Sequence, residues 1–131
     1  MDKKKCIIDK YNTVYGFNLF VIVNPDKSIV DKRFGFRDDD TSIIDDEWAS
    51  YTAYTTRGAY DKLADEDCGI IVINKLKNTN NDINTFAHES FYAAVDILEA
   101  CNIKLSKDTN EVFAYLIGYF TECVNKTASK A

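Results

Sequence analysis

The chain has 131 residues, of which 46% are hydrophobic and 13% aromatic, and this composition is typical of one globular domain. Its formal charge of −5 argues against a nucleic-acid partner, because binding to phosphates requires a basic surface. No segment approaches the roughly 20 consecutive apolar residues of a membrane span, and the apolar run after the basic start is too short for a signal peptide. We therefore expect a cytoplasmic protein with neither nucleic-acid nor membrane partners.

The first 76 residues are predicted to be mainly β-structure. Residues 6–10 are expected to form a short strand. Residues 14–23 are rich in aromatic and β-branched side chains, end at a turn-forming cluster, and predict a longer strand. Residues 28–37 are expected to return as the second strand of a hairpin, and the continuous apolar run 68–76 predicts a buried strand.

Residues 38–67 are predicted to be irregular. They carry three acidic clusters and a ring-rich stretch at 48–54. Acidic clusters of this kind are usually solvated loops, and their spacing does not match a calcium-binding EF-hand.

Two helices are expected to close the chain. The first spans residues 82–101, ends at Asn102 and repeats apolar residues every three or four positions. The second begins at Asp108 or Thr109 and continues to residue 126. Because the connection is short, we expect residues 77–131 to form an antiparallel helix pair. The predicted fold is therefore a single α+β domain over residues 1–131, with a small antiparallel or mixed sheet followed by two packed helices.

The first helix contains the only histidine, in the run His88-Glu89-Ser90-Phe91-Tyr92. In zinc peptidases with the His-Glu-x-x-His motif, two histidines four residues apart bind one metal, and the glutamate activates the bound water. Here Tyr92 stands where the second histidine belongs. Its phenol ionises near pH 10 and is a poor zinc ligand at neutral pH, so we expect no stoichiometric zinc.

The same residues can also have purely structural roles that involve neither metal binding nor catalysis. His88 is then a histidine hydrogen-bonded to a neighbouring carboxylate or carbonyl. Glu111 stands three residues after Asp108, which is the spacing of a capping box. Tyr92 and Tyr115 are then half-buried rings with surface hydroxyls.

Two segments of the C-terminal half, FAHESFYAAVDILEACNI (86–103) and NEVFAYLIGYFTECV (110–124), resemble a family of small bacteriophage-encoded proteins with an AHESxH-like helix and a following NExxAYLxGY-like helix. This resemblance implies a zincin-like domain of the minimal gluzincin type. By position, His88 would be the first metal ligand, Glu89 the general base and Glu111 the third ligand, with Tyr115 near the same cleft. Tyr92 departs from the pattern at the second ligand.

We therefore expect a degenerate, metal-free site in which His88, Glu89, Tyr92 and Glu111 form a hydrogen-bonded cluster. Such a protein would act by binding a protein, either of the host or as an accessory part of the virion, and would be found in the host cytoplasm or in the particle. One alternative is an active zinc peptidase with Glu89 as its base and Asp96 as a further ligand. Another is a structural or inhibitory protein whose motif is incidental and whose rings and acidic loops form a binding surface.

Overall fold

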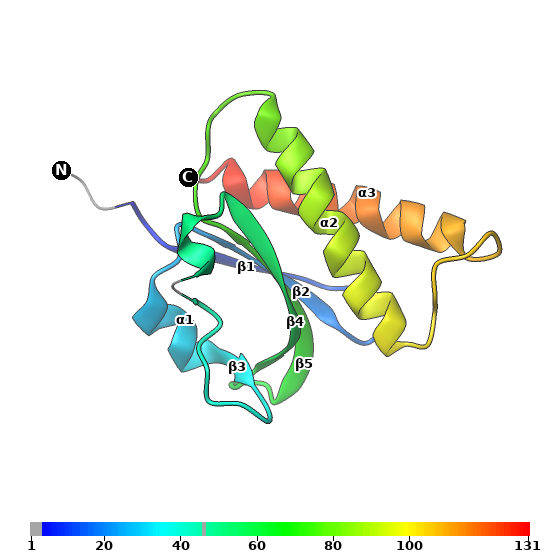
Figure 1. Ribbon diagram of the computed structural model, residues 1–131, viewed down its shortest axis with the longest axis horizontal. Coiled ribbons are helices and arrows are strands. Elements are labelled where there is room, and N and C mark those ends of the chain that lie inside the picture. The colour runs from blue at the N-terminus through cyan, green and yellow to red at the C-terminus, as the bar shows by residue number, and fades with distance from the viewer. Residues whose placement is uncertain (1–3, 46) are drawn as a thin grey trace.

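The computed structural model describes residues 4–45 and 47–131. A five-stranded mixed sheet is covered on one face by two long C-terminal helices and on the other by a short helix and a long loop (Figure 1). The predicted α+β arrangement, a small mixed sheet followed by two packed helices, is confirmed. The elements in chain order are β1 (Ile7–Tyr11), β2 (Asn18–Val23), α1 (Lys27–Arg33), β3 (Phe34–Phe36), η1 (Trp48–Ser50), β4 (Ala53–Asp61), β5 (Glu66–Ile73), α2 (Asn81–Ala100) and α3 (Asn110–Ala128).

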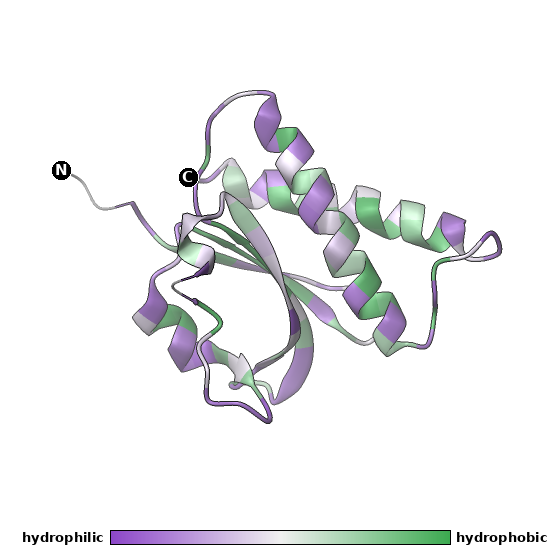
Figure 2. Cartoon of the chain, viewed as in Figure 1, coloured by the Kyte–Doolittle hydropathy of each residue, from purple (hydrophilic) through white to green (hydrophobic). Residues whose placement is uncertain are grey.

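The strand order is β1-β2-β5-β4-β3, with β2 and β5 parallel and the other neighbours antiparallel. The buried parts of β2 and β5, residues 19–23 and 70–73, are apolar throughout, because both faces of the sheet are covered there. Alternate side chains enter two cores, and these strands appear green in Figure 2. The core beneath α2 and α3 takes Leu19, Val21, Val23, Ile71 and Ile73, whereas the core on the α1 side takes Phe20, Ile22, Ile70 and Val72.

The two C-terminal helices lie within two residues of their predicted bounds. Asn102, which follows α2, has a positive φ of 62°, as expected of a residue that ends a helix. The helices pack against each other but cross obliquely, rather than lying side by side along their length (Figure 1). Most of the apolar residues that recur at helical spacing lie in the core, as that spacing predicts. Ile83 and Phe91 of α2 also belong to the spacing, and the prediction that they are buried is wrong, because both are exposed.

The predicted hairpin of residues 14–23 and 28–37 is wrong. Residues 27–33 form α1, because the Asp26 carboxylate accepts hydrogen bonds from the backbone N–H groups of Ser28 and Ile29 and so caps a helix. The chain then returns as β3, which pairs with β4 and not with β2. The short strand predicted at residues 6–10 is confirmed as β1.

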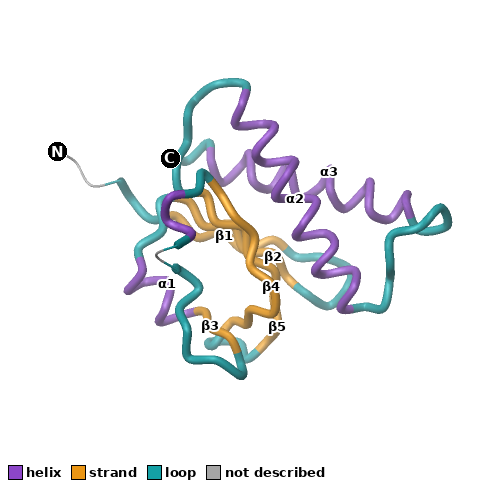
Figure 3. Tube along the Cα trace, viewed as in Figure 1, coloured by secondary structure: helices purple, strands orange, loops and turns teal. Residues whose placement is uncertain are grey.

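The prediction that residues 38–67 are irregular is wrong for β4, which is the longest of the described strands. The rest of that segment includes the loop between β3 and β4, residues 37–52, which we call the acidic loop; Asp46 lies outside the described residues. In the view of Figure 3 the acidic loop runs to the left of β4, and it carries η1 just before that strand begins.

Candidate functional site

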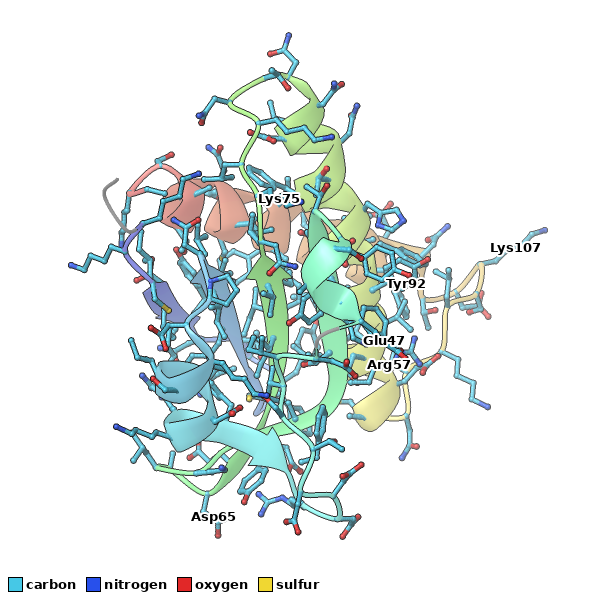
Figure 4. The ribbon with its side chains drawn as sticks, turned by 60° about the vertical axis from the view of Figure 1, so that its left-hand side comes forward. Glu47, Arg57, Asp65, Lys75, Tyr92 and Lys107 are labelled. Atoms are coloured by element: carbon cyan, nitrogen blue, oxygen red, sulfur yellow. The ribbon has the colours of Figure 1, made fainter. Side chains whose placement is uncertain are left out.

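A cavity of about 600 Å³ lies between α2, β4 and the acidic loop. Five consecutive residues of β4 form its floor, α2 forms one wall and the acidic loop forms the other. Tyr92 and Arg57, which belong to α2 and β4, appear in the same region of the molecule in Figure 4. The lining residues are Phe36, Thr41, Ser42, Ile43, Asp45, Trp48, Tyr51, Ala53, Tyr54, Thr55, Thr56, Arg57, His88, Glu89 and Tyr92.

The floor of the cavity is an open strand edge. β3 pairs only with residues 59–61 of β4, whereas β5 pairs with β4 along its other side. Gly58, with a φ of +72°, lies in an irregularity between Thr56 and Ala59 that separates the paired part of β4 from the open part. Within the described ranges, no strand pairs with the outer side of residues 53–57. Backbone N–H and C=O groups of this edge are therefore available to another chain.

His88 and Glu89 share a hydrogen bond at the cavity. His88 Nδ1 lies 2.8 Å from Glu89 Oε2, and the imidazole side chain is 64% exposed whereas the carboxylate side chain is 9% exposed. The hydroxyl of Thr55 on β4 donates to Glu89 Oε1 at 2.9 Å. Both carboxylate oxygens of Glu89 are therefore engaged, and the bond to the carboxylate places the proton of a neutral His88 on Nδ1.

Tyr92 lies one helical turn after His88 on the same wall. The two rings meet edge to face with their centroids 5.0 Å apart. The ring of Phe91 also meets that of Tyr92 edge to face, with the two centroids 5.5 Å apart. Tyr92 is 42% exposed. No hydrogen bond from its hydroxyl to another side chain is found among residues 4–45 and 47–131, so its ring and not its hydroxyl group shapes this wall.

Three rings of the acidic loop and β4 form the opposite wall. The centroid of Trp48 lies 5.5 Å from that of Tyr51 and 5.4 Å from that of Tyr54. The Tyr54 hydroxyl donates to the backbone carbonyl of Ile43 at 3.3 Å. Burial, with a smaller contribution from the negative charge of Asp45, raises the pKa of Tyr54 to about 12. This phenol is therefore neutral at any physiological pH.

The other residues predicted for the site lie elsewhere. Glu111 and Tyr115 are exposed on α3 and do not line the cavity. Glu111 follows the N-cap residue Thr109, whose side chain makes no capping hydrogen bond. Asp96, one turn beyond Tyr92, is partly buried but also does not line the cavity. Of the predicted four-residue cluster, the structure thus brings together His88, Glu89 and Tyr92.

The donors at the cavity do not fit a catalytic zinc site. Such sites use three protein ligands, and Tyr92 replaces one histidine while Glu111 lies outside the cavity. In the part of the chain that the structure describes, no group of three or more His, Cys, Asp and Glu side chains is arranged to hold a metal ion. We therefore assign no metal-dependent step to these residues.

Sequence reasoning missed Thr55 and the open edge, because residues 38–67 were interpreted as a loop. The segment AYTTRGAYD at residues 53–61 is rich in tyrosine and threonine, which favour strands, and this signal could have identified β4.

Comparisons with protein-family models, curated proteins and solved structures gave no significant match to this chain. No helix within the described ranges is long and apolar enough to cross a membrane.

Proposed function

We propose that this chain is a binding protein whose cavity receives an extended segment of another protein. The observation that carries the proposal is the open edge of β4 in the floor of the cavity. A row of free backbone donors and acceptors pairs most completely with another extended chain, which adds as a further strand. Rings on both walls, among them Tyr92 and Trp48, offer apolar contact area for the side chains of that strand.

In this proposal the His-Glu site is degenerate and not catalytic. A general base must be able to accept a proton from the water or group that it activates. Glu89 is buried, and its two carboxylate oxygens already accept hydrogen bonds from Thr55 and His88. Tyr92 occupies the second ligand position with an aromatic ring that packs on His88. The ring at position 92 supports a site that binds without hydrolysing, since it leaves His88 without a second imidazole to share a zinc ion.

The resemblance to phage-encoded proteins suggests where such a protein acts. We propose that the bound segment belongs to a host protein or to a component of the virion, so that the protein works in the host cytoplasm or in the particle. The zincin-like classification of the scaffold belongs to the same proposal. It is supported by the order of the elements, a small sheet followed by a His-Glu helix and a second helix.

Binding is tested with the fluorescence of Trp48, which is the only tryptophan and lies 42% exposed on the cavity wall. The probe is a positional-scanning library of capped decapeptides. We expect saturable changes in Trp48 emission that weaken at least tenfold in Tyr92→Ala. Tyr115→Ala is the matched control, since it removes an exposed tyrosine from α3 outside the cavity. If no sub-library binds, or if both variants respond alike, the proposed binding function is wrong.

The degenerate-site part is tested by metal titration. Calorimetry of the wild-type chain should show no stoichiometric zinc, whereas Tyr92→His should introduce zinc binding. Adding Glu111→Gln to Tyr92→His should leave that zinc affinity unchanged, because Glu111 lies outside the cavity. A full equivalent of zinc bound through His88 in the wild type would overturn this part of the proposal. If Tyr92→His leaves zinc affinity unchanged, the motif is incidental, and the chain is a structural or inhibitory protein.

The alternative function is a zinc peptidase, whose extended substrate would lie along the strand edge beside His88 and Glu89, but it would need zinc ligands beyond those that line the cavity. This function requires proteolysis that is sensitive to chelators and is abolished by Glu89→Gln. The absence of hydrolysis across a broad peptide panel supplied with zinc would exclude it.

A further inference from the structure

The geometry of the cavity also indicates which side chains the bound segment carries. Successive side chains of a strand point to opposite faces of a sheet. On β4, Thr55 points towards α2, where it bonds to Glu89, and Tyr54 points towards the acidic loop, where it contacts Ile43 and Trp48. A strand added along this edge extends the sheet, so its alternate side chains face α2 and the acidic loop in turn.

The wall formed by the acidic loop is negatively charged. Asp45 lines the cavity, and Glu47, two residues later, is exposed. Among residues 4–45 and 47–131, neither carboxylate forms an ion pair with a lysine or an arginine. The arginine of this loop, Arg37, is instead bound to Asp65 and Asp67 at 2.7 and 2.8 Å.

The cation that lines the cavity does not neutralise this wall. Arg57 is the sole lysine or arginine among the described lining residues. Its guanidinium lies 3.9 Å from the carboxylate of Glu99 on α2 and also interacts with Asp96. Arg57 therefore pairs with carboxylates of α2, whereas among the described residues no lysine or arginine forms an ion pair with Asp45 or Glu47.

The wall formed by α2 also carries rings, but it differs from the acidic-loop wall in having no exposed carboxylate among its lining residues. Tyr92 and His88 present two rings that meet edge to face, and the carboxylate beside them, Glu89, is buried and hydrogen-bonded. Side chains that face this wall meet aromatic surface and not free charge. They should therefore be apolar or aromatic.

Resting on the proposed function, we infer that the bound segment is a basic strand, with lysine or arginine at the alternate positions that face the acidic loop, where Asp45 lines the cavity, and apolar residues at the positions that face Tyr92. Opposite charge selects among the partners of an interface and speeds their encounter, and its effect falls with added salt. The buried hydroxyl of Thr56 lacks a hydrogen-bond partner among the described residues although Thr56 lines the cavity, which is consistent with a floor that is completed by another molecule.

Three capped octapeptides test this inference through Trp48 emission: one alternates lysine and valine, the second alternates glutamate and valine, and the third has four lysines followed by four valines. We expect the alternating lysine peptide to bind at least tenfold more tightly than either of the others at 50 mM salt. We expect the difference to shrink several-fold at 500 mM salt. An alternating lysine peptide that is N-methylated at every second residue, on the edge that would face β4, should not bind.

Two variants locate the charge effect. Asp45→Asn combined with Glu47→Gln should weaken binding of the alternating lysine peptide at least fivefold. Asp108→Asn combined with Glu122→Gln, two exposed carboxylates away from the cavity, changes the net charge equally and should leave binding unchanged.

Two kinds of failure are distinguishable. If decapeptide sub-libraries bind but the glutamate peptide, the grouped isomer or the N-methylated peptide binds as tightly as the alternating lysine peptide, the basic-strand inference is wrong and the binding function stands. Equal weakening by the two double variants also overturns the inference, because it would reveal unspecific attraction to an acidic protein. If no decapeptide sub-library binds at all, the proposed function itself fails.

Discussion

Replacement of Asp96 by asparagine should stabilise this protein at neutral pH. Asp96 lies on α2, and burial raises the pKa of its carboxyl from 3.8 to about 6, although Arg57 partly opposes this shift and Glu99 adds to it. A shift of about two units corresponds to a ceiling of about 3 kcal/mol, since one unit is worth about 1.4 kcal/mol. Because the side chain is partly exposed and solvent screens its charge, we expect about 1–2 kcal/mol.

The direction in which stability changes with pH follows from proton binding to Asp96. The folded chain holds the Asp96 proton more tightly than the unfolded chain does, so the free energy of unfolding falls as pH rises from about 4 to about 6. Asp96→Asn removes this loss. The variant should therefore match the wild type near pH 4 and exceed its free energy of unfolding by about 1–2 kcal/mol at pH 7.

Urea unfolding followed by circular dichroism at pH 4, 5, 6 and 7 measures the difference between the two proteins. Asp108→Asn is the matched control, because Asp108 is exposed in the connection between α2 and α3, and its substitution should give a difference that does not change with pH. An Asp96→Asn difference that is the same at pH 4 and pH 7, or a variant less stable than the wild type at pH 7, would refute the reasoning.

Three further predictions concern the fold. At pH 8 Cys68 and Cys123 should react with Ellman's reagent only after unfolding, because burial raises the pKa of their thiols to about 12 and about 11, while the two half-buried cysteines react first. Gly58→Ala should cost about 1–2 kcal/mol in a thermal melt, since its φ is +72°. Thr127→Val should cost about 1–3 kcal/mol because Thr127 is fully buried and donates to Asp9. Burial raises the pKa of Asp9, but hydrogen bonds from Lys130 and Thr127 outweigh it and leave that pKa lowered, so the cost of Thr127→Val should diminish as pH falls below about 4 in urea titrations.

The helices and the central strands were predictable because each carries its own periodic signal. On both long helices the apolar residues recur at helical spacing. Phe86 and Leu98 of α2 and Phe120 of α3 belong to this pattern, and all three are buried. The continuous apolar run of β5 indicated a strand covered on both faces, which the two cores confirm. In these elements the local pattern and the tertiary packing agree, so the sequence pattern is sufficient to predict the element.

The predicted hairpin failed because two local signals conflict. Ile29 and Val30 favour a strand, and a turn-forming cluster precedes them. Asp26 in that cluster caps a helix instead, and only Val30 of α1 is buried. A seven-residue helix with one buried side chain has little apolar periodicity, so the capping residue was the decisive signal.

The site was predictable only on α2. His88 and Tyr92 share a helical face by spacing alone, and the structure places both at the cavity. Thr55 and Trp48 are more than thirty residues away in sequence, and the position of β4 beneath α2 brings them there. Glu111 could not be placed by sequence, because the crossing of α3 over α2 decides which side of the pair its first turn faces.

The pair His88-Glu89 has a structural role that does not depend on catalysis. A buried carboxylate is costly unless its oxygens are hydrogen-bonded. Glu89 meets this requirement through Thr55 on β4 and His88 on its own helix, and so it ties α2 to the strand that forms the cavity floor. A histidine before a glutamate therefore does not by itself indicate a peptidase in this fold. Tyr92 stands where the His-Glu-x-x-His motif has its second histidine, and in this structure its ring packs on His88.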